Sequence, residues 1–473
     1  MRNNSMYPLS FDSDARIVII GAGPTGLSAA NRLEELGYPN WDLFEAEEVP
    51  GGLARSFEDE NGFTWDIGGH VQFSHYDYFD DLMDDLLGDG WLHHEREAWA
   101  WMFDRFVPYP VQNNIRHFPD EALIECLDGM VDAAKKQAAG NLNGSINTFR
   151  DWMKASFGEG FCKHFMYPYN FKVWAYDPAE MTTNWVGDRV ASPDVGQIME
   201  NVITESDDVS WGPNNTFRFP ERGGTGSIWK TLAYRLPQER LHYGKRVTHV
   251  DTADKKLRFK DGSTEAYDIV LSTMPIDLLA KMSDREELHE TADRAKFSSS
   301  NIIGIGIDGE LPDRMNRKCW MYFPEDNCPF YRVTVFSNYS PHHVSEPGEQ
   351  WSLMAEVSES PAKPVNCDRV VEDVVQGMLN TKLLTPDDDI VSRWHFRADH
   401  GYPTPFLERS SVITPIRETM EEHDVYSRGR FGAWQYEVSN QDHSCMQGVE
   451  FVNRLFFETP EMTLHHPTIV NGR

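Results

Sequence analysis

The feature that most constrains this chain is a glycine-rich turn between a short apolar strand and a helix. Residues 16–20 read Arg-Ile-Val-Ile-Ile, and Gly21-Ala-Gly23-Pro-Thr-Gly26 follows directly. A helix is predicted over 27–36, and a second strand is predicted over 41–44. Such glycines permit a tight turn, close approach of a pyrophosphate and close helix–strand packing, while the helix N-terminus stabilises negative charge. The segment therefore predicts a dinucleotide-binding strand–helix–strand unit.

The residues that follow favour FAD over NAD. Glu45 ends the second strand, where an acid accepts hydrogen bonds from a ribose and disfavours a 2′-phosphate. A second glycine turn at Gly51-Gly52, with Arg55 close behind, suits the pyrophosphate of a long, extended dinucleotide. A strand meander over 246–275 and a helix over 444–457 agree with this interpretation. A cofactor domain assembled from the start, middle and end of the chain resembles the large FAD-binding group that includes the amine oxidases.

The segments between these pieces predict two inserts. Apolar residues recur at helical spacing over 119–139 and 146–166, whereas strands are expected over 302–307, 319–323, 330–336 and 351–357. We therefore expect an α/β fold, with a discontinuous Rossmann-like FAD-binding domain, a helical insert domain and an antiparallel β-sheet substrate domain. The expected boundaries assign residues 1–100, 213–295 and 426–473 to FAD binding, 101–212 to a mainly helical, substrate-binding insert, and 296–425 to the antiparallel sheet.

Charge and composition exclude several classes of function. The 44 Lys and Arg residues against 75 Asp and Glu residues give a formal net charge of −31, too negative for a surface that tracks nucleic acid or anionic lipid. No apolar run approaches the roughly 20 residues that cross a bilayer, and the first residues are polar, so a cytoplasmic protein is expected. The six cysteines have no zinc-ligand spacing, and no metal centre is expected.

Several segments rich in polar and aromatic residues follow no amphipathic period, which is typical of binding loops. They include WDIGGHVQFSH, PYPVQNNI, YNFKVWA, FPERGGTG, YFPEDNCPFYR, DHGYPTP and SRGRFGAWQYEVSNQDHS. In this order the runs resemble the UDP-galactopyranose mutases, and the longer eukaryotic-type branch of that family more than the short bacterial one. The resemblance extends from residue 17 to residue 473.

This resemblance implies an isomerase that uses flavin without net redox chemistry. In the family, N5 of reduced FAD attacks the anomeric carbon of UDP-galactopyranose, UDP leaves, and the sugar ring opens and recloses as the furanose before UDP returns. The expected activity is therefore interconversion of UDP-galactopyranose and UDP-galactofuranose. The expected partners are a UDP-sugar substrate and an external reductant such as NAD(P)H or a reductase, and we expect a homo-oligomer.

The resemblance also implies the residues of the site. Arg189 and Arg332 match two arginines that bind the diphosphate, and His70 matches a histidine whose loop senses flavin reduction; these three are the candidate catalytic residues. The candidate substrate-binding residues are Tyr109, Gln112, Phe165, Asn170, Trp174, Arg189, Asn214, Tyr322, Arg332, Tyr339, Tyr402, Tyr436 and Asn440. The candidate cofactor-binding residues are Gly21, Gly23, Pro24, Thr25, Gly26, Glu45, Ala46, Gly52, Leu53, Gly68, Gly69, His70, Val247, Arg430, Asn440, Gln441 and Ser444.

Physical reasoning supports the arginines and leaves alternatives open. A guanidinium is always charged and bonds two oxygens at once, which suits a diphosphate that must be held before and after its bond to the sugar breaks. One alternative keeps this chemistry on a different nucleotide-sugar, and another is an FAD-dependent oxidoreductase of the amine-oxidase type, which needs no such arginine pair. A third is a nucleotide-sugar-binding protein without catalysis. For the adjacent Asp442 and His443 we expect side chains that point apart and no dyad.

Overall fold

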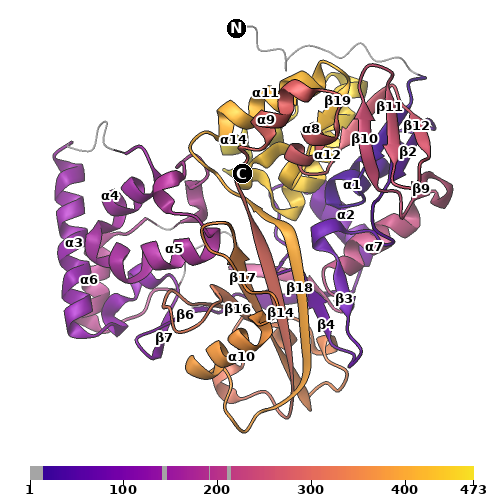
Figure 1. Cartoon of the computed structure of the whole chain (residues 1–473). Coiled ribbons are helices and arrows are strands. Elements are labelled where there is room, and N and C mark those ends of the chain that lie inside the picture. Colours follow the sequence, from indigo (N-terminus) through magenta and orange to yellow (C-terminus); the bar gives the residue numbers. More distant parts are fainter. Residues whose placement is uncertain (1–13, 141–145, 191, 210–214, 473) are drawn as a thin grey trace.

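The computed structural model describes residues 14–140, 146–190, 192–209 and 215–472. Three substructures are visible in Figure 1: a cofactor unit at the upper right, an antiparallel sheet below it and a group of helices at the left. Among the described residues, no helix is long and apolar enough to cross a bilayer. The predicted fold class is confirmed.

The cofactor unit is built on a five-stranded sheet in the order β19-β13-β1-β2-β9, in which every paired neighbour is parallel. Both faces of this sheet are covered, as is typical of parallel strands, and the strands are mainly apolar. The strands are β1 (Ile17–Ile20), β2 (Trp41–Phe44), β9 (Leu241–His242), β13 (Ile269–Ser272) and β19 (Val425–Ser427).

Helices and a meander pack against this sheet. Helix α1 (Pro24–Glu35) and helix α12 (Gln441–Phe457) share one apolar cluster with the sheet, and the meander shares a second cluster with α8 and α11. These elements come from distant parts of the chain, as the sequence predicts. The elements of this unit include α2 (Asp77–Leu87), α7 (Gly226–Arg235), β10 (Val247–Asp251), β11 (Lys256–Phe259), β12 (Thr264–Ala266), α8 (Ile276–Met282), α9 (His289–Ala292), α11 (Arg409–Glu421), α13 (Met462–His465) and α14 (Pro467–Asn471).

The second sheet has seven strands in the order β18-β14-β17-β16-β15-β6-β7. Its long central strand β14 pairs antiparallel with both β17 and β18, and β15 pairs parallel with β6. Helix α10 packs on its apolar cluster. The elements are β6 (Ala98–Met102), β7 (Arg105–Pro108), β14 (Phe297–Asp308), β15 (Trp320–Tyr322), β16 (Arg332–Val335), β17 (Gln350–Glu359), α10 (Val370–Asn380) and β18 (Asp389–Pro403).

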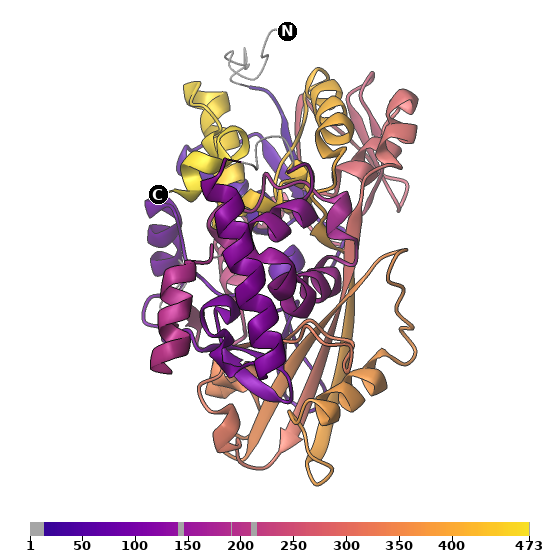
Figure 2. The same cartoon turned by 90° about the vertical axis from the view of Figure 1, so that its left-hand side faces the viewer.

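The group of helices packs around its own apolar cluster beside this sheet, and Figure 2 shows α3 and α6 on the face turned toward the viewer. A capping box fixes the start of α4: Thr148 Oγ1 accepts from the Asp151 amide at 3.1 Å, and Asp151 accepts from the Thr148 amide at 3.0 Å. The helices are α3 (Asp120–Ala138), α4 (Phe149–Phe161), α5 (Tyr167–Trp174) and α6 (Val195–Thr204).

The structure differs from the expected elements in three places. Strand β6 spans the expected border at residue 100, and β6 and β7 join the seven-stranded sheet, because the apolar run at Ala98–Met102 pairs with β15. The segment Gly401–Pro403, expected as a loop, ends the strand β18, whose polar, half-exposed residues give little strand signal. Helix α12 begins at Gln441, three residues before the predicted start. Two antiparallel two-stranded sheets complete the fold: β3 (Ser56–Glu58) with β4 (Thr64–Asp66), and β5 (Trp91–Glu95) with β8 (Thr216–Pro220).

Candidate functional site

One large cavity, of about 1290 Å³, receives residues from all three substructures. A typical pocket for a single ligand measures about 300–1000 Å³, so this cavity has room for a dinucleotide and a second ligand together. At one end lie the turns after β1 and β2, and at the other end lie arginine and tyrosine side chains from the helices and the antiparallel sheet.

The first end fits a pyrophosphate. Gly21 has a φ of +103°, which favours glycine. At Gly23 an added Cβ would meet the Cα of Gly52 at 3.8 Å, and at Gly52 it would meet the Cα of Gly23 at 3.1 Å, so the two glycine turns lie close together. Helix α1 has no side-chain cap at its N-terminus, and the buried Nε of Arg55 has no partner among the described residues. Open amides and a guanidinium are the donors that a diphosphate requires, so these residues fit FAD.

Glu45 lies at the rim of this end and is buried. Its carboxylate accepts from the backbone amides of Ala22 at 2.6 Å and Glu47 at 2.9 Å. These bonds fix both carboxylate oxygens toward the cavity wall and leave lone pairs for a further donor. The geometry is compatible with the ribose contact that the sequence predicts for Glu45.

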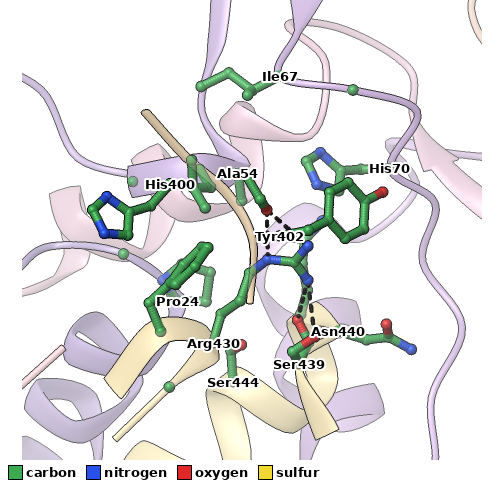
Figure 3. A pocket seen from close by; sticks show the side chains of 18 of the residues that line it. Pro24, Ala54, Ile67, His70, His400, Tyr402, Arg430, Ser439, Asn440 and Ser444 are labelled. Carbon is green, nitrogen blue, oxygen red and sulfur yellow. Dashed lines mark hydrogen bonds between the residues drawn. The ribbon is translucent and has the colours of Figure 1, made fainter. Parts of the chain in front are cut away.

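Arg430 lies at the centre of the view in Figure 3, between the β18 end and the start of α12. Its guanidinium donates to the Gly401 carbonyl at 3.0 Å and to Ser439 Oγ at 2.9 Å, and it lies 4.8 Å from the centre of the Tyr402 ring. Both acceptors are neutral, so the arginine keeps its full positive charge in the cavity.

His70 is drawn beside Arg430 and Tyr402 in Figure 3. Burial, followed by the charge of Arg430, lowers the pKa of His70 to about 4. Its Nδ1 is buried with no partner among the described residues. The imidazole is therefore neutral near pH 7, which fits a loop residue that contacts the cofactor rather than a proton donor.

Arg332, at the start of β16, is held by a buried carboxylate. Glu356 on β17 accepts from Arg332 Nε at 2.7 Å and Nη2 at 2.9 Å. The same carboxylate accepts from the Tyr331 hydroxyl at 2.6 Å and the Gly69 amide at 3.1 Å. Burial alone would raise the pKa of Glu356, but Arg332 and the other donors lower it overall. Glu356 therefore joins Arg332 to the loop that carries His70.

Arg189 is held more loosely. Its Nη2 donates to the Glu437 carbonyl at 2.7 Å, and its guanidinium lies 5.6 Å from the centre of the Tyr436 ring. The Glu437 carboxylate is fixed separately by two contacts with Arg409, at 2.7 and 2.8 Å. Arg189, like Arg430, thus donates to neutral oxygen atoms and not to a carboxylate.

Tyr436 lies within the electrostatic influence of three of the arginines that line the cavity. Burial raises the pKa of Tyr436, and Tyr402 adds to the rise, while Arg189, Arg430 and Arg332 act in the opposite direction. The hydroxyl stays protonated at neutral pH and can donate. The sequence-predicted Arg189 and Arg332 therefore lie on the same cavity although they come from different substructures.

A cluster of aromatic rings closes the side toward the helices. The Tyr109 and Tyr322 rings lie 4.8 Å apart between centroids, and Tyr169 lies 5.6 Å from Tyr322 at an interplanar angle of 77°. Burial raises the pKa of Tyr109 and of Tyr322, so both hydroxyls remain donors at neutral pH. Flat rings with polar ends suit a nucleobase and its ribose.

The structure brings most of the predicted site residues to this cavity. Those that line it are Gly21, Gly23, Pro24, Thr25, Glu45, Ala46, Gly52, Leu53, Gly68, Gly69, His70, Tyr109, Arg189, Val247, Tyr322, Arg332, Tyr402, Arg430, Tyr436, Asn440, Gln441 and Ser444. Gly26 packs instead against the turn, where a Cβ would lie 1.9 Å from the Gly21 carbonyl oxygen.

Five predicted residues lie behind the cavity wall, and one lies outside the described residues. Trp174 packs edge-on against Tyr436 at 4.8 Å between ring centroids, so it supports that tyrosine from behind. The other four are Gln112, Phe165, Asn170 and Tyr339, all buried. Asn214 falls in the segment that the structure does not describe. The ligand contacts predicted for these residues stay predictions.

Sequence reasoning missed several residues of the site. Glu356 is an acid inside the apolar run of β17, and this unusual position is the sequence signal that could have identified it as a site residue. Asp442 and His443 do not point apart as expected: Asp442 Oδ1 lies 3.1 Å from His443 Nδ1, because the carboxylate turns back along the first turn of α12. His75 contacts the same carboxylate at 2.8 Å.

Comparisons with known proteins agree with this geometry. A family model described as flavin-containing amine oxidoreductase matches residues 24–432. Among curated proteins, 15-cis-phytoene desaturase of Glycine max is 39% identical over 70 residues, which is 15% of this chain and 12% of that protein. Protoporphyrinogen oxidase 2 of Arabidopsis thaliana is 38% identical over 74 residues, 16% of this chain and 14% of that protein. The chain thus aligns with only about an eighth of the length of these curated relatives.

Two solved structures match nearly the whole chain. A putative protoporphyrinogen oxidase from Exiguobacterium sp. 255-15 has 17% identity and a TM-score of 0.71, with 94% of this chain and 99% of that chain covered, and it shows the fold alone. A reduced UDP-galactopyranose mutase has 49% identity and a TM-score of 0.93, with 97% of both chains covered. The chain belongs to the family of flavin-containing amine oxidoreductases and, within it, to the UDP-galactopyranose mutases.

Proposed function

We propose that this protein interconverts UDP-galactopyranose and UDP-galactofuranose on reduced FAD, with no net oxidation or reduction. The observation that carries the proposal is the placement of Arg189 and Arg332 on the cavity whose other end fits FAD. An oxidoreductase of the amine-oxidase type needs a pocket for an oxidisable substrate and gains nothing from two diphosphate-binding arginines.

The cofactor supplies one part of the chemistry and the chain supplies the rest. When bound and reduced, FAD supplies the nucleophile for the anomeric carbon of the sugar. Arg332, fixed by Glu356, and Arg189 would each bind diphosphate oxygens with two N–H groups. Both keep UDP in the cavity after its bond to the sugar breaks, so that the same UDP returns to the rearranged sugar.

The tyrosines add donors without adding charge. Tyr436 and Tyr402 lie together, with 5.9 Å between their ring centroids, beside the arginines. We assign Tyr402, Tyr436 and Tyr339 to phosphate oxygens, because a neutral hydroxyl donates more strongly as negative charge grows on the leaving diphosphate. Burial raises the pKa of Tyr339 far above its ordinary value, so this hydroxyl does not ionise.

The aromatic side of the cavity is assigned to uridine. Tyr109 and Tyr322 offer two rings on the cavity surface that are tilted by 48° to each other. The contacts that the family resemblance implies for the residues behind the wall are retained as part of the proposal: Gln112, Phe165, Asn170, Trp174 and, outside the described residues, Asn214. We also propose an external reductant such as NAD(P)H, and a homo-oligomeric state.

The deciding experiment is a product assay. Purified protein is mixed with UDP-galactopyranose, with and without dithionite, and the nucleotide-sugars are separated by HPLC. A furanose product that appears only with reductant supports the proposal. Turnover without reductant, or none with it across several UDP-sugars, contradicts it.

Arginine variants test the assigned roles. Arg189→Ala and Arg332→Ala should lose most of the activity while flavin absorbance remains. The matched control is Arg369→Ala, since Arg369 is an exposed arginine on the outer surface near α10, paired only with Asp373. Near-normal turnover in either cavity variant would show that the diphosphate assignment is wrong.

A further inference from the structure

A second group of titratable side chains lies beside the cavity and has no role in the proposed function. It consists of His75, from the loop after β4, and Asp442 and His443, from the first turn of α12. Asp442 Oδ2 lies 2.8 Å from His75 Nδ1 and accepts from the His75 amide at 3.2 Å, while Asp442 Oδ1 lies 3.1 Å from His443 Nδ1. We call these three residues the His–Asp–His cluster.

The cluster is largely buried and incompletely hydrogen-bonded. The side chains of Asp442 and His443 are fully buried, and that of His75 is 11% exposed. Among the described residues, Asp442 Oδ1 and both ring nitrogens of His443 have no hydrogen-bond partner of acceptable geometry. Unpaired polar atoms in an interior are costly, so their retention calls for a role beyond packing.

Few further charges act on the cluster. The carboxylate of Asp80 on α2 interacts electrostatically with Asp442, and Arg218 on β8 pairs with Asp80 at 3.0 Å. Tyr76 contacts the His443 ring edge-on at 5.8 Å, and Cys445 on α12 is buried with a pKa raised by burial. No described basic side chain bonds to Asp442 other than the two imidazoles. Proton exchange in this region therefore falls to the imidazoles.

A metal site is a poor explanation of the cluster. Its ligand atoms lie within 4.8 Å of one another, but two of the three residues, Asp442 and His443, sit on the first turn of α12. The N-terminus of a helix carries partial positive charge, which opposes a bound cation and favours the Asp442 carboxylate. The pKa of Asp442 is held far below its usual range: burial alone would raise it, and the contacts with His443 and His75 reverse this. The carboxylate is thus ionised, and a proton is the cation that the cluster can hold.

The position of the cluster links it to the cofactor. His75 and Asp442 line the same cavity as Asn440, Gln441 and Ser444, the proposed flavin contacts at the N-terminus of α12. Two-electron reduction with uptake of a single proton leaves the bound flavin as an anion, next to a buried carboxylate. Two negative charges in a dry interior repel strongly, and one proton on the imidazoles removes that repulsion.

We propose that the His–Asp–His cluster takes up one proton when the bound flavin is reduced by two electrons, and releases it on reoxidation. The flavin gains two electrons and one proton, and the cluster gains the second proton, so two protons enter per two electrons. These residues position charge and do not touch the sugar. The inference rests on the proposed binding of FAD but not on the proposed sugar chemistry.

The test is the pH dependence of the flavin midpoint potential in the holoenzyme. Anaerobic dye-equilibrated titrations, followed by flavin absorbance, are run between about pH 6 and pH 8.5. One pH unit is a tenfold change in proton concentration, which is about 30 mV for one proton in a two-electron couple. The midpoint potential of the wild type should therefore fall by about 60 mV per pH unit. The midpoint potentials of Asp442→Asn and His443→Gln should fall by about 30 mV per pH unit.

Asp80→Asn is the matched control, because it removes a nearby acid whose side chain is half exposed and outside the cluster. It should keep the wild-type slope. If Asp442→Asn fails to fold, His443→Gln and His75→Gln carry the test. The inference is overturned if the potential of the cluster variants depends on pH as steeply as that of the wild type. It is also overturned if the midpoint potential of the wild type falls by only about 30 mV per pH unit. A purified protein without flavin would refute the proposed function instead, and the product assay reports separately on the sugar chemistry.

Discussion

Glu356 offers the sharpest test of how the site is held, because one buried carboxylate serves four donor atoms. It accepts two bonds from Arg332, one from Tyr331 and one from Gly69, and its side chain is 2% exposed. In Glu356→Gln the amide group must face the guanidinium, so Arg332 loses its charged partner. Breaking a buried ion pair from one side costs about 3–5 kcal/mol.

The expected effect on melting follows from chain length. Unfolding entropy is about 2.1 cal/mol/K per residue, or about 1 kcal/mol/K for 473 residues. A loss of about 3 kcal/mol should therefore lower Tm by about 3 °C. Arg332→Met leaves the buried Glu356 carboxylate without its charged partner, and it should lower the free energy of unfolding by about the same amount. The double variant removes both charges, and replacing both members of a buried pair with neutral groups is often nearly neutral.

The assay is a double-mutant cycle of thermal unfolding in the holoprotein, followed by circular dichroism. We expect each single variant to lose about 3 °C and the double variant to lose about 1 °C, so that the two changes are strongly coupled. Glu356 has a depressed folded pKa, so its contribution is present above the ordinary carboxyl pKa and is lost as pH falls through the folded value. The coupling should thus be constant from about pH 6 to pH 9. A double variant that loses the sum of the two single effects would refute the reasoning.

The remaining predictions concern glycines and titrating groups. Gly26→Ala places its Cβ 1.9 Å from a backbone oxygen of the same turn and should lower both stability and flavin content. Gly23→Ala, with its nearest contact at 3.8 Å, should lower flavin content alone. Equal losses in melting temperature for the two variants would contradict this prediction. Burial raises the pKa of Asp66 from 3.8 to about 6. The protonated carboxyl group therefore contributes stability that is fully present below pH 3.8 and is lost as the pH rises through 6. Asp66→Asn should therefore stabilise the protein at pH 8 by up to about 3 kcal/mol and not at pH 4, and a pH-independent difference in urea denaturation would count against it. Burial and Arg430 lower the pKa of His70 to about 4, so its ¹⁵N resonances should not titrate between about pH 6 and pH 8; a midpoint in that range would show a more open site.

The cofactor unit was largely predictable because its signals are local. The strand β1, the turn from Gly21 to Gly26 and the strand β2 follow one another in the chain, and each residue has a stated geometric reason. The predicted strand range 41–44 coincides with β2. The meander over 246–275 was predicted for the same reason, because short apolar runs bounded by turns are recognisable from the local sequence.

The second sheet was less predictable because its pairing is long-range. Strand β6 joins β15, more than 200 residues away, and nothing in the local pattern of Ala98–Met102 indicates that partner. Strand β18 carries polar residues along much of its length, so its alternation does not separate it from a loop. Edge strands with polar faces are where periodicity contributes least.

The candidate site shows the same division between local and long-range information. The two arginines were identified from their motifs, but their partners were not, because Glu356 and the Glu437 carbonyl approach from elements 24 and 248 residues away. The His–Asp–His cluster was missed for a different reason. We treated Asp442 and His443 as neighbours on an ideal helix, whereas the carboxylate bends back to meet His75, 367 residues earlier.

The different support of the cavity arginines explains how an acidic protein accommodates two diphosphates. The Glu356 carboxylate offsets the charge of Arg332 and accepts two hydrogen bonds from it, so the position of Arg332 in the site is fixed. Arg189 and Arg430 meet carbonyl or hydroxyl groups, which hold their positions without removing their charge. Because a neutral acceptor is easily exchanged for a phosphate oxygen, these two arginines can turn to a ligand at little cost. The net charge of −31 therefore describes the whole chain, while the cavity keeps uncompensated positive charge at the places where phosphates are proposed to bind.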